Sequence, residues 1–316
     1  MSSPIPFNIP PLTGDELPGL TEVLEGKQLS GNGRFTRQCH AYFEDQLKSR
    51  KTLLTTSCTD ALEMAALLLR LKPGDEVIIP AYTFVSTALA FFRQGATIVF
   101  ADSRPDHPGI DEGSIRKLIT PRTKAIVVVH YAGIACDMDR IMQIAADSGL
   151  YVVEDAAQAV GAAYCGQDGK KRPLGSIGHL ATFSFHDTKN IQCGEGGLLV
   201  VNDDKFVARS EILWEKGTNR SAFYRGEVSA YEWVDTGSSF LPSELNAAFL
   251  FAQLQSLKKY KSGVSTCGGP MSGAFSRCAG GWGRDCAKCR TTPYITRIFT
   301  TSSRRIARNG IDSSSI

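Results

Sequence analysis

Short apolar runs alternate with helical patterns between residues 50 and 202, and no other feature restricts the fold of this chain as strongly. The runs have the length of buried strands. Strands that alternate with helices are typical of a mainly parallel sheet with helices packed on its faces. We therefore predict an α/β fold. The predicted strands are 76–80, 97–101, 125–130, 151–154, 181–185 and 198–201.

Three helices are predicted from the apolar spacing. In the first, residues 59–71, Thr59 is the predicted N-cap, and leucine and alanine side chains repeat at helical intervals. The second covers residues 138–148. The third begins near residue 244 and ends near residue 258.

The net charge of +3 is unevenly distributed along the chain. Residues 261–316 contain nine Lys or Arg and two acidic residues, whereas residues 1–260 contain 26 basic and 30 acidic residues. The excess of basic groups therefore belongs to the C-terminal segment, and the main body has the mixed charges of a solvated surface. We expect no nucleic-acid partner.

The N-terminal residues do not combine a basic stretch with an apolar one, and no later run is long and apolar enough to span a bilayer. The nine cysteines show no compact disulfide framework, and the histidines and cysteines of the main body form no metal-ligand set. These features favour a cytoplasmic protein with reduced thiols, no membrane partner and no metal.

Three segments place chemically useful side chains at the carboxyl ends of predicted strands, where open α/β sheets bind ligands. Residues 55–59 lead into a helix, so they either bind a phosphate through free N–H groups or only cap the helix. Glu154 and Asp155 end a strand, and a carboxylate there either holds a protonated ring nitrogen or caps the next helix. Lys189 follows a buried strand, so its amine is either a nucleophile toward a carbonyl or a surface charge.

In this order and spacing, the three segments resemble the DegT/StrS family of nucleotide-sugar aminotransferases, which are fold-type-I enzymes that depend on pyridoxal phosphate (PLP). The resemblance extends from Ile5 to Tyr260. Residues 57–62 resemble the family's phosphate-binding turn, residues 80–87 its ring-stacking segment, residues 154–158 its ring-nitrogen motif, and residues 184–197 its lysine segment.

The resemblance implies a role for each of several residues. Lys189 is the catalytic residue and carries PLP as a Schiff base. Asp155 pairs with the ring nitrogen, and Gln158 lies near the ring hydroxyl. The other implied cofactor contacts are ring stacking by Phe84, phosphate binding by Cys58, Thr59 and Ser184, and a contact of Ser239, where many members have asparagine, with the phosphate in a neighbouring subunit.

By the same resemblance, an amino group passes from glutamate to a nucleotide-linked keto sugar, and the protein is a homodimer with shared sites. Residues 215–220 and 237–240 resemble the branch of the family that forms dTDP-4-amino-4,6-dideoxygalactose. The implied substrate is therefore a dTDP-4-keto-6-deoxyhexose, and the implied pathway is cell-surface polysaccharide biosynthesis. The implied partners are this nucleotide sugar and glutamate.

The sequence changes character near residue 261. Residues 1–260 have the pattern of the PLP-binding large domain, whereas residues 261–316 are rich in glycine, serine and cysteine and lack clear periodicity. We interpret the second segment as a frame-shifted or disordered tail that replaces the family's small C-terminal domain and leaves that domain incomplete. Two alternatives are a zinc site that includes Cys286 and Cys289 and a nucleic-acid contact through residues 304–308.

The altered tail leaves two further functions open. One is a truncated PLP-binding fragment without catalytic activity, and the other is a non-enzymatic regulatory protein on the same fold. A related class of enzymes, the PLP-dependent sugar dehydratases, has histidine in place of the Schiff-base lysine. Lys189 argues against that branch.

Overall fold

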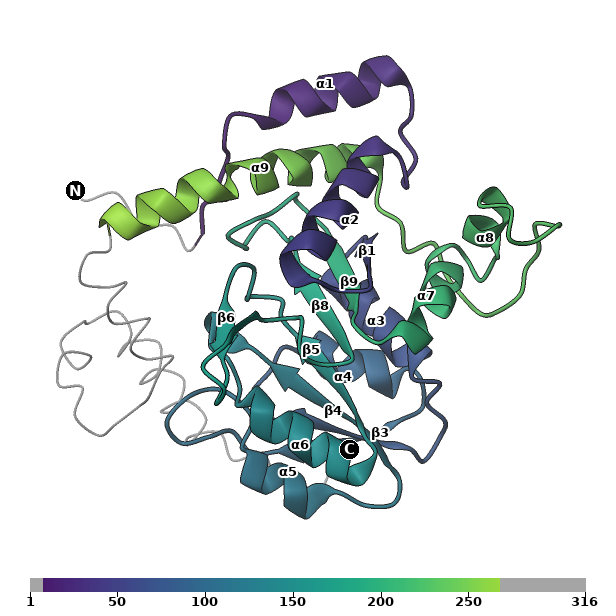
Figure 1. Ribbon diagram of the computed structural model, residues 1–316. Helices are drawn as coiled ribbons and strands as arrows, with labels where there is room; N and C mark the ends of the chain where they lie inside the picture. Colours follow the sequence, from purple (N-terminus) through teal and green to yellow (C-terminus); the bar gives the residue numbers. More distant parts are fainter. Residues whose placement is uncertain (1–7, 268–316) are drawn as a thin grey trace, which may run out of the picture. The chain divides into compact units, whose positions relative to one another are not determined.

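The computed structural model describes residues 8–267, and its core is a seven-stranded sheet (Figure 1). The strand order is β1-β9-β8-β5-β4-β2-β3. The bounds are β1 Lys51–Thr55, β2 Glu76–Pro80, β3 Thr97–Ala101, β4 Thr123–Val129, β5 Tyr151–Asp155, β8 Leu180–Ser184 and β9 Gly197–Val201. A separate two-stranded sheet contains β6 Ala163–Cys165 and β7 Lys171–Pro173.

The sheet is mainly parallel, as predicted from the sequence. The pairs β8–β5, β5–β4, β4–β2 and β2–β3 are parallel, whereas β9 is antiparallel to both of its neighbours, β1 and β8. The central strands are buried on both faces, which is why they appear in the sequence as continuous apolar runs rather than as alternating ones.

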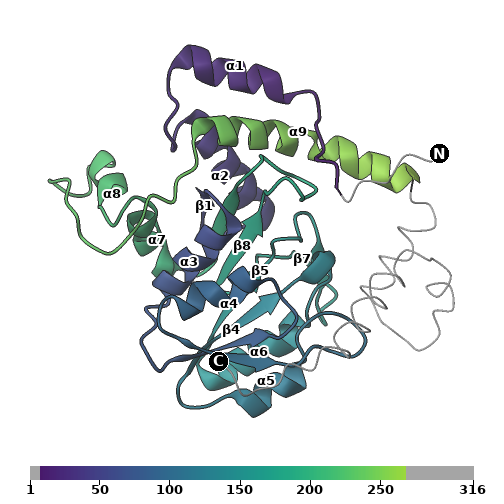
Figure 2. The ribbon, with the colours of Figure 1, turned by 180° about the vertical axis from the view of Figure 1, so that it is seen from behind.

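Helices cover both faces of this sheet. The bounds are α1 Glu16–Gly26, α2 Arg34–Leu47, α3 Cys58–Leu68, α4 Val85–Phe92, α5 Glu112–Leu118, α6 Met138–Ser148, α7 Val207–Trp214, α8 Arg220–Tyr224 and α9 Glu244–Cys267, with short 3-10 turns η1 Tyr131–Gly133 and η2 Asp204–Phe206. The helices α5 and α6 lie in front of the sheet in Figure 1, and α3 and α4 lie in front of it when the molecule is turned (Figure 2).

Alternate side chains of each strand enter different parts of the core. Leu199 packs in the cluster that includes the α3, α4 and α7 side chains, whereas its neighbour Leu198 packs in the cluster of α2 and α9 on the other face. Ile78 belongs to a third cluster, formed with α5 and α6. This alternation follows from the period of two in a strand, and it fixes which residues remain at the strand ends.

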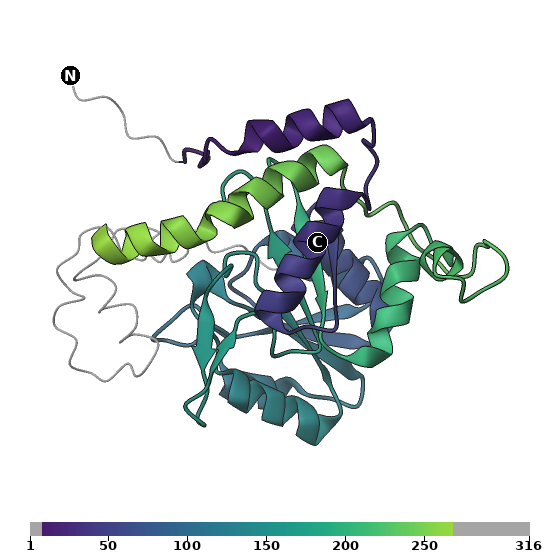
Figure 3. The ribbon, with the colours of Figure 1, turned by 45° about the horizontal axis from the view of Figure 1, so that its top comes forward.

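The N-terminal helix α1 lies beside α9 in all three views (Figure 3). The side chain of Gln253 in α9 donates hydrogen bonds to the Pro11 carbonyl oxygen and to the Glu16 carboxylate. Glu244, at the start of α9, accepts backbone N–H groups of Gly33 and Phe35 and so satisfies the first turn of α2. These polar contacts tie both ends of the described chain together.

Several details differ from the expectations from sequence, among them the end of the first predicted helix, which is Leu68 and not residue 71. Ser57, not Thr59, is the N-cap of α3, because its hydroxyl oxygen accepts the Asp60 N–H. α9 continues to Cys267 instead of ending near residue 258. The sequence analysis also missed the edge strand β1, whose partner β9 lies far along the chain.

The chain divides after Gly263 into two units, and the sheet belongs to the first. Most of the tail predicted from residue 261 onward lies outside the described residues. The same holds for the zinc site at Cys286 and Cys289 and for the basic segment 304–308. Within residues 8–267, none of the helices combines the length and hydropathy that a membrane crossing requires.

Candidate active site

The segments singled out from the sequence meet at the carboxyl ends of β5 and β8 and at the start of α3. Gly197, the first residue of β9, pairs with Thr55 on one side and with Ser184 on the other. A side chain at Gly197 would overlap the backbone of Ser57 and Cys58. The glycine therefore allows β9 to lie directly against the helix start, and it brings Ser184 close to the turn before α3.

The start of α3 presents free hydrogen-bond donors. Ser57 caps the helix through Asp60, but within residues 8–267 the N–H groups of Cys58 and Thr59 have no acceptor. The Thr59 hydroxyl lies 2.8 Å from that of Ser86. Free N–H groups at the positive end of a helix attract an anion, and a phosphate group can accept hydrogen bonds from both of them.

The Cys58 thiol stays protonated at neutral pH. Burial raises its pKa well above the ordinary value, and the charge of Asp155 raises it further, against opposing contributions from Thr182 and Lys189. A thiol with a raised pKa is a poor nucleophile. The useful group of Cys58 is therefore its backbone N–H.

Asp155 ends β5 and is 5% exposed. One carboxylate oxygen accepts the Thr87 hydroxyl at 2.7 Å, and the other accepts the Ala157 N–H at 3.1 Å. Burial raises the pKa of this carboxyl, although these two hydrogen bonds and the charges of His130 and Lys189 act in the opposite direction. Each oxygen has a further lone pair, so the carboxylate can accept a hydrogen bond from a cationic ligand.

Lys189 lies in the turn after β8, where its N–H donates to the His186 carbonyl oxygen. The residue is half-buried. No carboxylate of the described residues lies within ion-pair distance of its ammonium group, although its charge reaches both Asp155 and Cys58. A lysine without a salt bridge beside a buried carboxylate is available to react with a ligand.

The other three predicted residues, Phe84, Gln158 and Ser239, form no hydrogen bond with Asp155 or Lys189 within residues 8–267. Phe84 precedes α4 and is 72% exposed, so its ring has a free face. The Gln158 side chain accepts the Ala132 N–H at 2.6 Å and thereby holds the turn that follows β4. Ser239 is exposed, and its backbone forms a bridge with Glu215, but its side chain has no contact that joins it to Asp155 or Lys189 within the described residues.

Glu154, the other candidate carboxylate, has a different place. It is fully buried and accepts the N–H groups of Gly175, Ile177 and Gly178 at 2.9, 2.7 and 2.5 Å. Its fourth partner is His130, at 2.9 Å. Glu154 therefore organises a loop rather than capping the next helix, and Asp155 does not cap a helix either, because none of the helices assigned to the described residues starts there.

Several functional residues escaped the sequence analysis. Thr87, which orients Asp155, stands within the ring-stacking segment without an assigned role, and it is 68 positions away from its partner. Ser57 is the N-cap of α3, and Gly197 lies directly against the backbone of Ser57 and Cys58. The local signals for Ser57 and Gly197 were the run of hydroxyl residues before the helix and the glycine pair before the strand 198–201.

The expected cofactor can be tested against these groups. PLP has a phosphate, which matches the free N–H groups of Cys58 and Thr59; a ring nitrogen, which matches the unused acceptor positions of Asp155; and an aldehyde, which matches the unpaired Lys189 amine. The orphaned donors and the buried carboxylate are otherwise costly features. The residues present therefore fit the cofactor.

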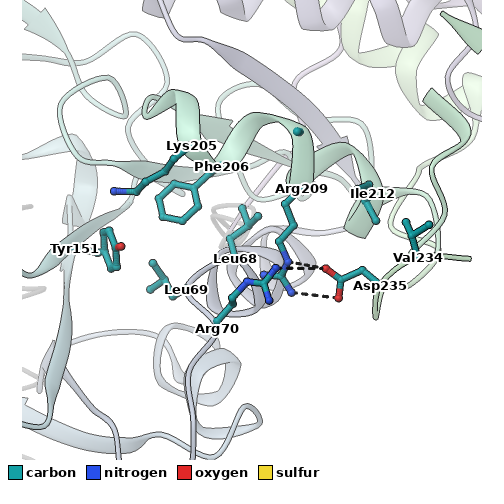
Figure 4. Close-up of a pocket in the computed structure, with 11 residues that line it drawn as sticks. Leu68, Leu69, Arg70, Tyr151, Lys205, Phe206, Arg209, Ile212, Val234 and Asp235 are labelled. Atoms are coloured by element: carbon teal, nitrogen blue, oxygen red, sulfur yellow. Dashed lines mark hydrogen bonds and ion pairs between the residues drawn. The ribbon is translucent and has the colours of Figure 1, made fainter. Parts of the chain in front are cut away.

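A cavity of about 530 Å³ lies elsewhere on the molecule (Figure 4). Tyr151, at the amino end of β5, forms part of its wall, whereas Asp155 is at the opposite end of the same strand. Arg209 and Asp235 form an ion pair of 2.7 Å along its rim. The cavity is thus separate from the candidate active site.

Comparison with known proteins gives one family match. The model of the DegT/DnrJ/EryC1/StrS aminotransferase family matches residues 11–265 of this chain. The match includes every segment that forms the site.

Individual relatives agree with this match. The spore coat polysaccharide biosynthesis protein SpsC of Bacillus subtilis is 36% identical over 279 residues, which cover 87% of this chain and 70% of SpsC. GDP-perosamine synthase of Caulobacter vibrioides is 35% identical over 79% of this chain and 64% of its own length. The structure of an aminotransferase from Psychrobacter cryohalolentis is similar with a TM-score of 0.74 and 33% identity, over 80% of this chain and 65% of that one. The chain thus spans about two thirds of the length of these proteins.

Proposed function

Because this chain belongs to the DegT/DnrJ/EryC1/StrS aminotransferase family, we propose that it transfers an amino group to a nucleotide-linked keto sugar. PLP is the cofactor of this family of sugar aminotransferases. When bound, it supplies an electron sink that stabilises negative charge at the carbon from which a proton is removed. The protein's part is to bind the cofactor, to hold its ring nitrogen protonated and to move the proton.

We assign the roles of the site residues as follows. The N–H groups of Cys58 and Thr59 and the hydroxyl of Ser184 bind the phosphate, and Phe84 packs against the ring. Gln158 lies beside the ring hydroxyl, and Ser239 extends toward the site of a neighbouring subunit. Lys189 would hold the cofactor through its amine, and the same amine, when free, would take up and return the proton at the donor's α-carbon.

The observation that carries this proposal is the environment of Asp155. It is a buried carboxylate, held by Thr87 and Ala157, with unused acceptor positions and with the unpaired Lys189 nearby. A carboxylate that only stabilised the fold would have most of its acceptor positions filled by donors, as those of Glu154 are. A buried carboxylate with open acceptor positions is suited to bind a protonated ring nitrogen.

For the substrate, we propose a dTDP-4-keto-6-deoxyhexose with glutamate as amino donor, which gives dTDP-4-amino-4,6-dideoxygalactose for cell-surface polysaccharide biosynthesis. The sequence of residues 215–220 and 237–240 supports this choice. Of the two relatives, one is named for polysaccharide biosynthesis and the other for a GDP-linked sugar. The GDP-linked keto sugar is therefore the competitor to test.

We also propose that the protein is a homodimer. Large apolar side chains are exposed at the residue before α4, on α4 itself and on β3: Phe84, Val85, Leu89, Phe92 and Phe100. Such a cluster on a surface is typical of a protein–protein interface. A second copy is the partner that we propose for it, since family resemblance implies sites shared between subunits.

The cytoplasm is the proposed location. All five cysteines of the described residues are free thiols: Cys39, Cys58, Cys136, Cys165 and Cys193. Unpaired cysteines are usual in a reducing compartment. We propose neither a membrane nor a nucleic acid as a partner.

The test is an amino-transfer assay with the purified chain, PLP and glutamate. Product formation is compared between a dTDP-linked and a GDP-linked 4-keto-6-deoxyhexose, with Lys189→Ala as the control that removes the reactive amine. We expect transfer to the dTDP sugar by the unaltered chain alone. Transfer only to the GDP sugar would contradict the substrate, and no transfer to either by PLP-loaded protein would favour the inactive fragment or a regulatory protein.

A further inference from the structure

Three side chains form a line of hydrogen bonds that ends on the Asp155 carboxylate. The hydroxyl of Thr83 lies 2.7 Å from that of Thr87, and the Thr87 hydroxyl lies 2.7 Å from Asp155 Oδ2. Thr87 is 0% exposed and Asp155 is 5% exposed, whereas Thr83 is half-buried. Because the inner part of the line is buried, the protein itself supplies the donor on this side of Asp155.

The loop after β2 and the helix α4 place the two threonines. Thr83 comes directly before Phe84, the residue at which α4 begins, and Thr87 lies in the first turn of this helix. The backbone N–H of Thr87 donates to the Phe84 carbonyl oxygen at 3.1 Å. The helix start thus turns the chain so that the side chains of Thr83 and Thr87, four positions apart, lie next to each other.

The number of protons fixes the direction of both hydrogen bonds. An ionised carboxylate can only accept, so the single hydroxyl proton of Thr87 is donated to Asp155. The Thr87 oxygen then accepts the hydroxyl proton of Thr83. The opposite direction requires a protonated Asp155 and leaves the Thr83 proton without an acceptor among residues 8–267. Within this part of the chain, both hydroxyl protons are therefore used only when Asp155 is ionised.

The two hydrogen bonds strengthen each other. A hydroxyl that accepts a hydrogen bond becomes a better donor, and a hydrogen bond to a charged acceptor is about twice as strong as one between neutral groups. Thr83 therefore acts on Asp155 without touching it, because its proton polarises the Thr87 hydroxyl. The Ala157 N–H donates to the other oxygen, Oδ1, and the two contacts together hold the carboxylate in one orientation.

We infer that Thr83 is a positioning residue that acts through Thr87 to keep Asp155 ionised and directed toward the cofactor's ring nitrogen. The inference rests on the proposed function, because it concerns the nitrogen of bound PLP. If the threonines only held the start of α4 against the end of β5, loss of a hydroxyl would change the stability of the fold. It would not change the protonation of that nitrogen.

The test uses PLP labelled with ¹⁵N at the ring nitrogen and bound to the full chain. The ¹⁵N chemical shift, followed as a function of pH, reports whether the nitrogen is protonated, independently of catalytic activity. Thr83→Val replaces the hydroxyl by a methyl group. We expect the nitrogen of this variant to lose its proton at a lower pH than in the unaltered chain. Thr87→Val removes the direct donor and should give a larger change in the same direction.

Two further variants serve as controls. Thr83→Ser keeps the hydroxyl and should restore the titration of the unaltered chain. Thr52→Val removes another threonine hydroxyl from the core, where it donates to the His40 carbonyl oxygen at 3.1 Å. Thr52 belongs to β1, and β9 and β8 lie between β1 and β5. Thr52→Val should therefore leave the ¹⁵N titration unchanged.

The outcomes separate this inference from the proposed function. If Thr83→Val does not fold, Thr83→Ala removes the same hydroxyl and takes its place. An unchanged ¹⁵N titration in the folded, PLP-bound Thr83 variant would overturn the inference and leave the proposed function intact, even if Thr87→Val changed it. An unaltered chain that binds no PLP would overturn both.

Discussion

Asp155 shows how a single residue acquires a function from its surroundings. Its strand-end position was evident from the sequence, and so was the alternative that it caps a helix. The choice between the two comes from Thr87 and Ala157, which bind the carboxylate from the side and leave acceptor positions open. Because Thr87 belongs to a distant helix, no local pattern could have revealed this contact.

Asp155→Asn removes the charge and keeps the shape of the side chain. An amide cannot hold the ring nitrogen of PLP protonated, so we expect amino transfer to fall about a hundredfold or more. Thermal unfolding should change little, because the amide oxygen still accepts the Thr87 hydroxyl. The measurement is kcat with glutamate as donor. As a control, Asp137→Asn makes the same replacement at the N-cap of α6 and should keep kcat within about twofold.

The His130–Glu154 pair makes stability depend on pH. Burial lowers the pKa of His130, but the buried contact with Glu154 acts in the opposite direction, and the folded-state pKa is raised from 6.5 to about 10. The imidazolium therefore stabilises the folded state fully below pH 6.5, and this stabilisation is lost as the pH rises through about 10. Breaking a buried pair costs about 3 to 5 kcal/mol.

Urea unfolding of the unaltered chain and of His130→Asn measures this effect. The difference in the free energy of unfolding between the two proteins should be large at about pH 6 and smaller above about pH 10. Other groups also titrate in this range, but their contributions are common to both proteins and cancel in the difference. A difference that stays constant across the range would mean that His130 carries no charge in the folded chain.

At the scale of elements, the sequence was informative wherever structure is local. The runs at β2 and β3 and the helix α6 have the bounds that the apolar pattern predicted. The pattern did not reveal β1, because that strand pairs antiparallel with β9 across more than half of the described chain. The apolar pattern also did not reveal the N-cap of α3. Ser57 and Thr59 are both good N-cap residues, and only the backbone conformation at the helix start decides between them.

Gly197 connects three elements, and replacing it tests the phosphate cradle. In Gly197→Ala, the new methyl group would overlap the backbone of Ser57 and Cys58, so β9 and the start of α3 must separate. We expect a loss of about 1 to 3 kcal/mol in the free energy of unfolding and weaker PLP binding. Gly26→Ala is the matched control, because nothing lies near its Cβ position. Equal PLP affinity in both variants would argue against a phosphate at this helix start.

At the scale of the whole molecule, the comparisons establish the family, and the chain spans about two thirds of the length of its relatives. The described residues contain all the groups that the proposed cofactor contacts require within one subunit. The contact that the resemblance implies for Ser239 would form only in the proposed dimer. The proposed dimer is thus part of the functional account.

The oligomeric state can be measured by light scattering after size exclusion. We expect a mass of twice the 34.2 kDa chain. Phe92→Glu places a charge in the exposed apolar cluster of α4 and should yield monomers, because a buried unpaired charge is costly at an interface. Leu24→Glu makes the same change on α1 and should leave the dimer intact. Dimers that persist in Phe92→Glu would place the interface elsewhere.

The central claim is that Lys189 holds PLP in a site formed by Asp155 and the start of α3. The most direct measurement is the mass of the full chain after incubation with PLP and reduction with borohydride, followed by mapping of the modified peptide. We expect one pyridoxyl group on Lys189 in the unaltered chain, and none on the corresponding peptide of Lys189→Ala. Folded protein that carries no adduct, or carries it on other lysines to the same extent, would contradict the account.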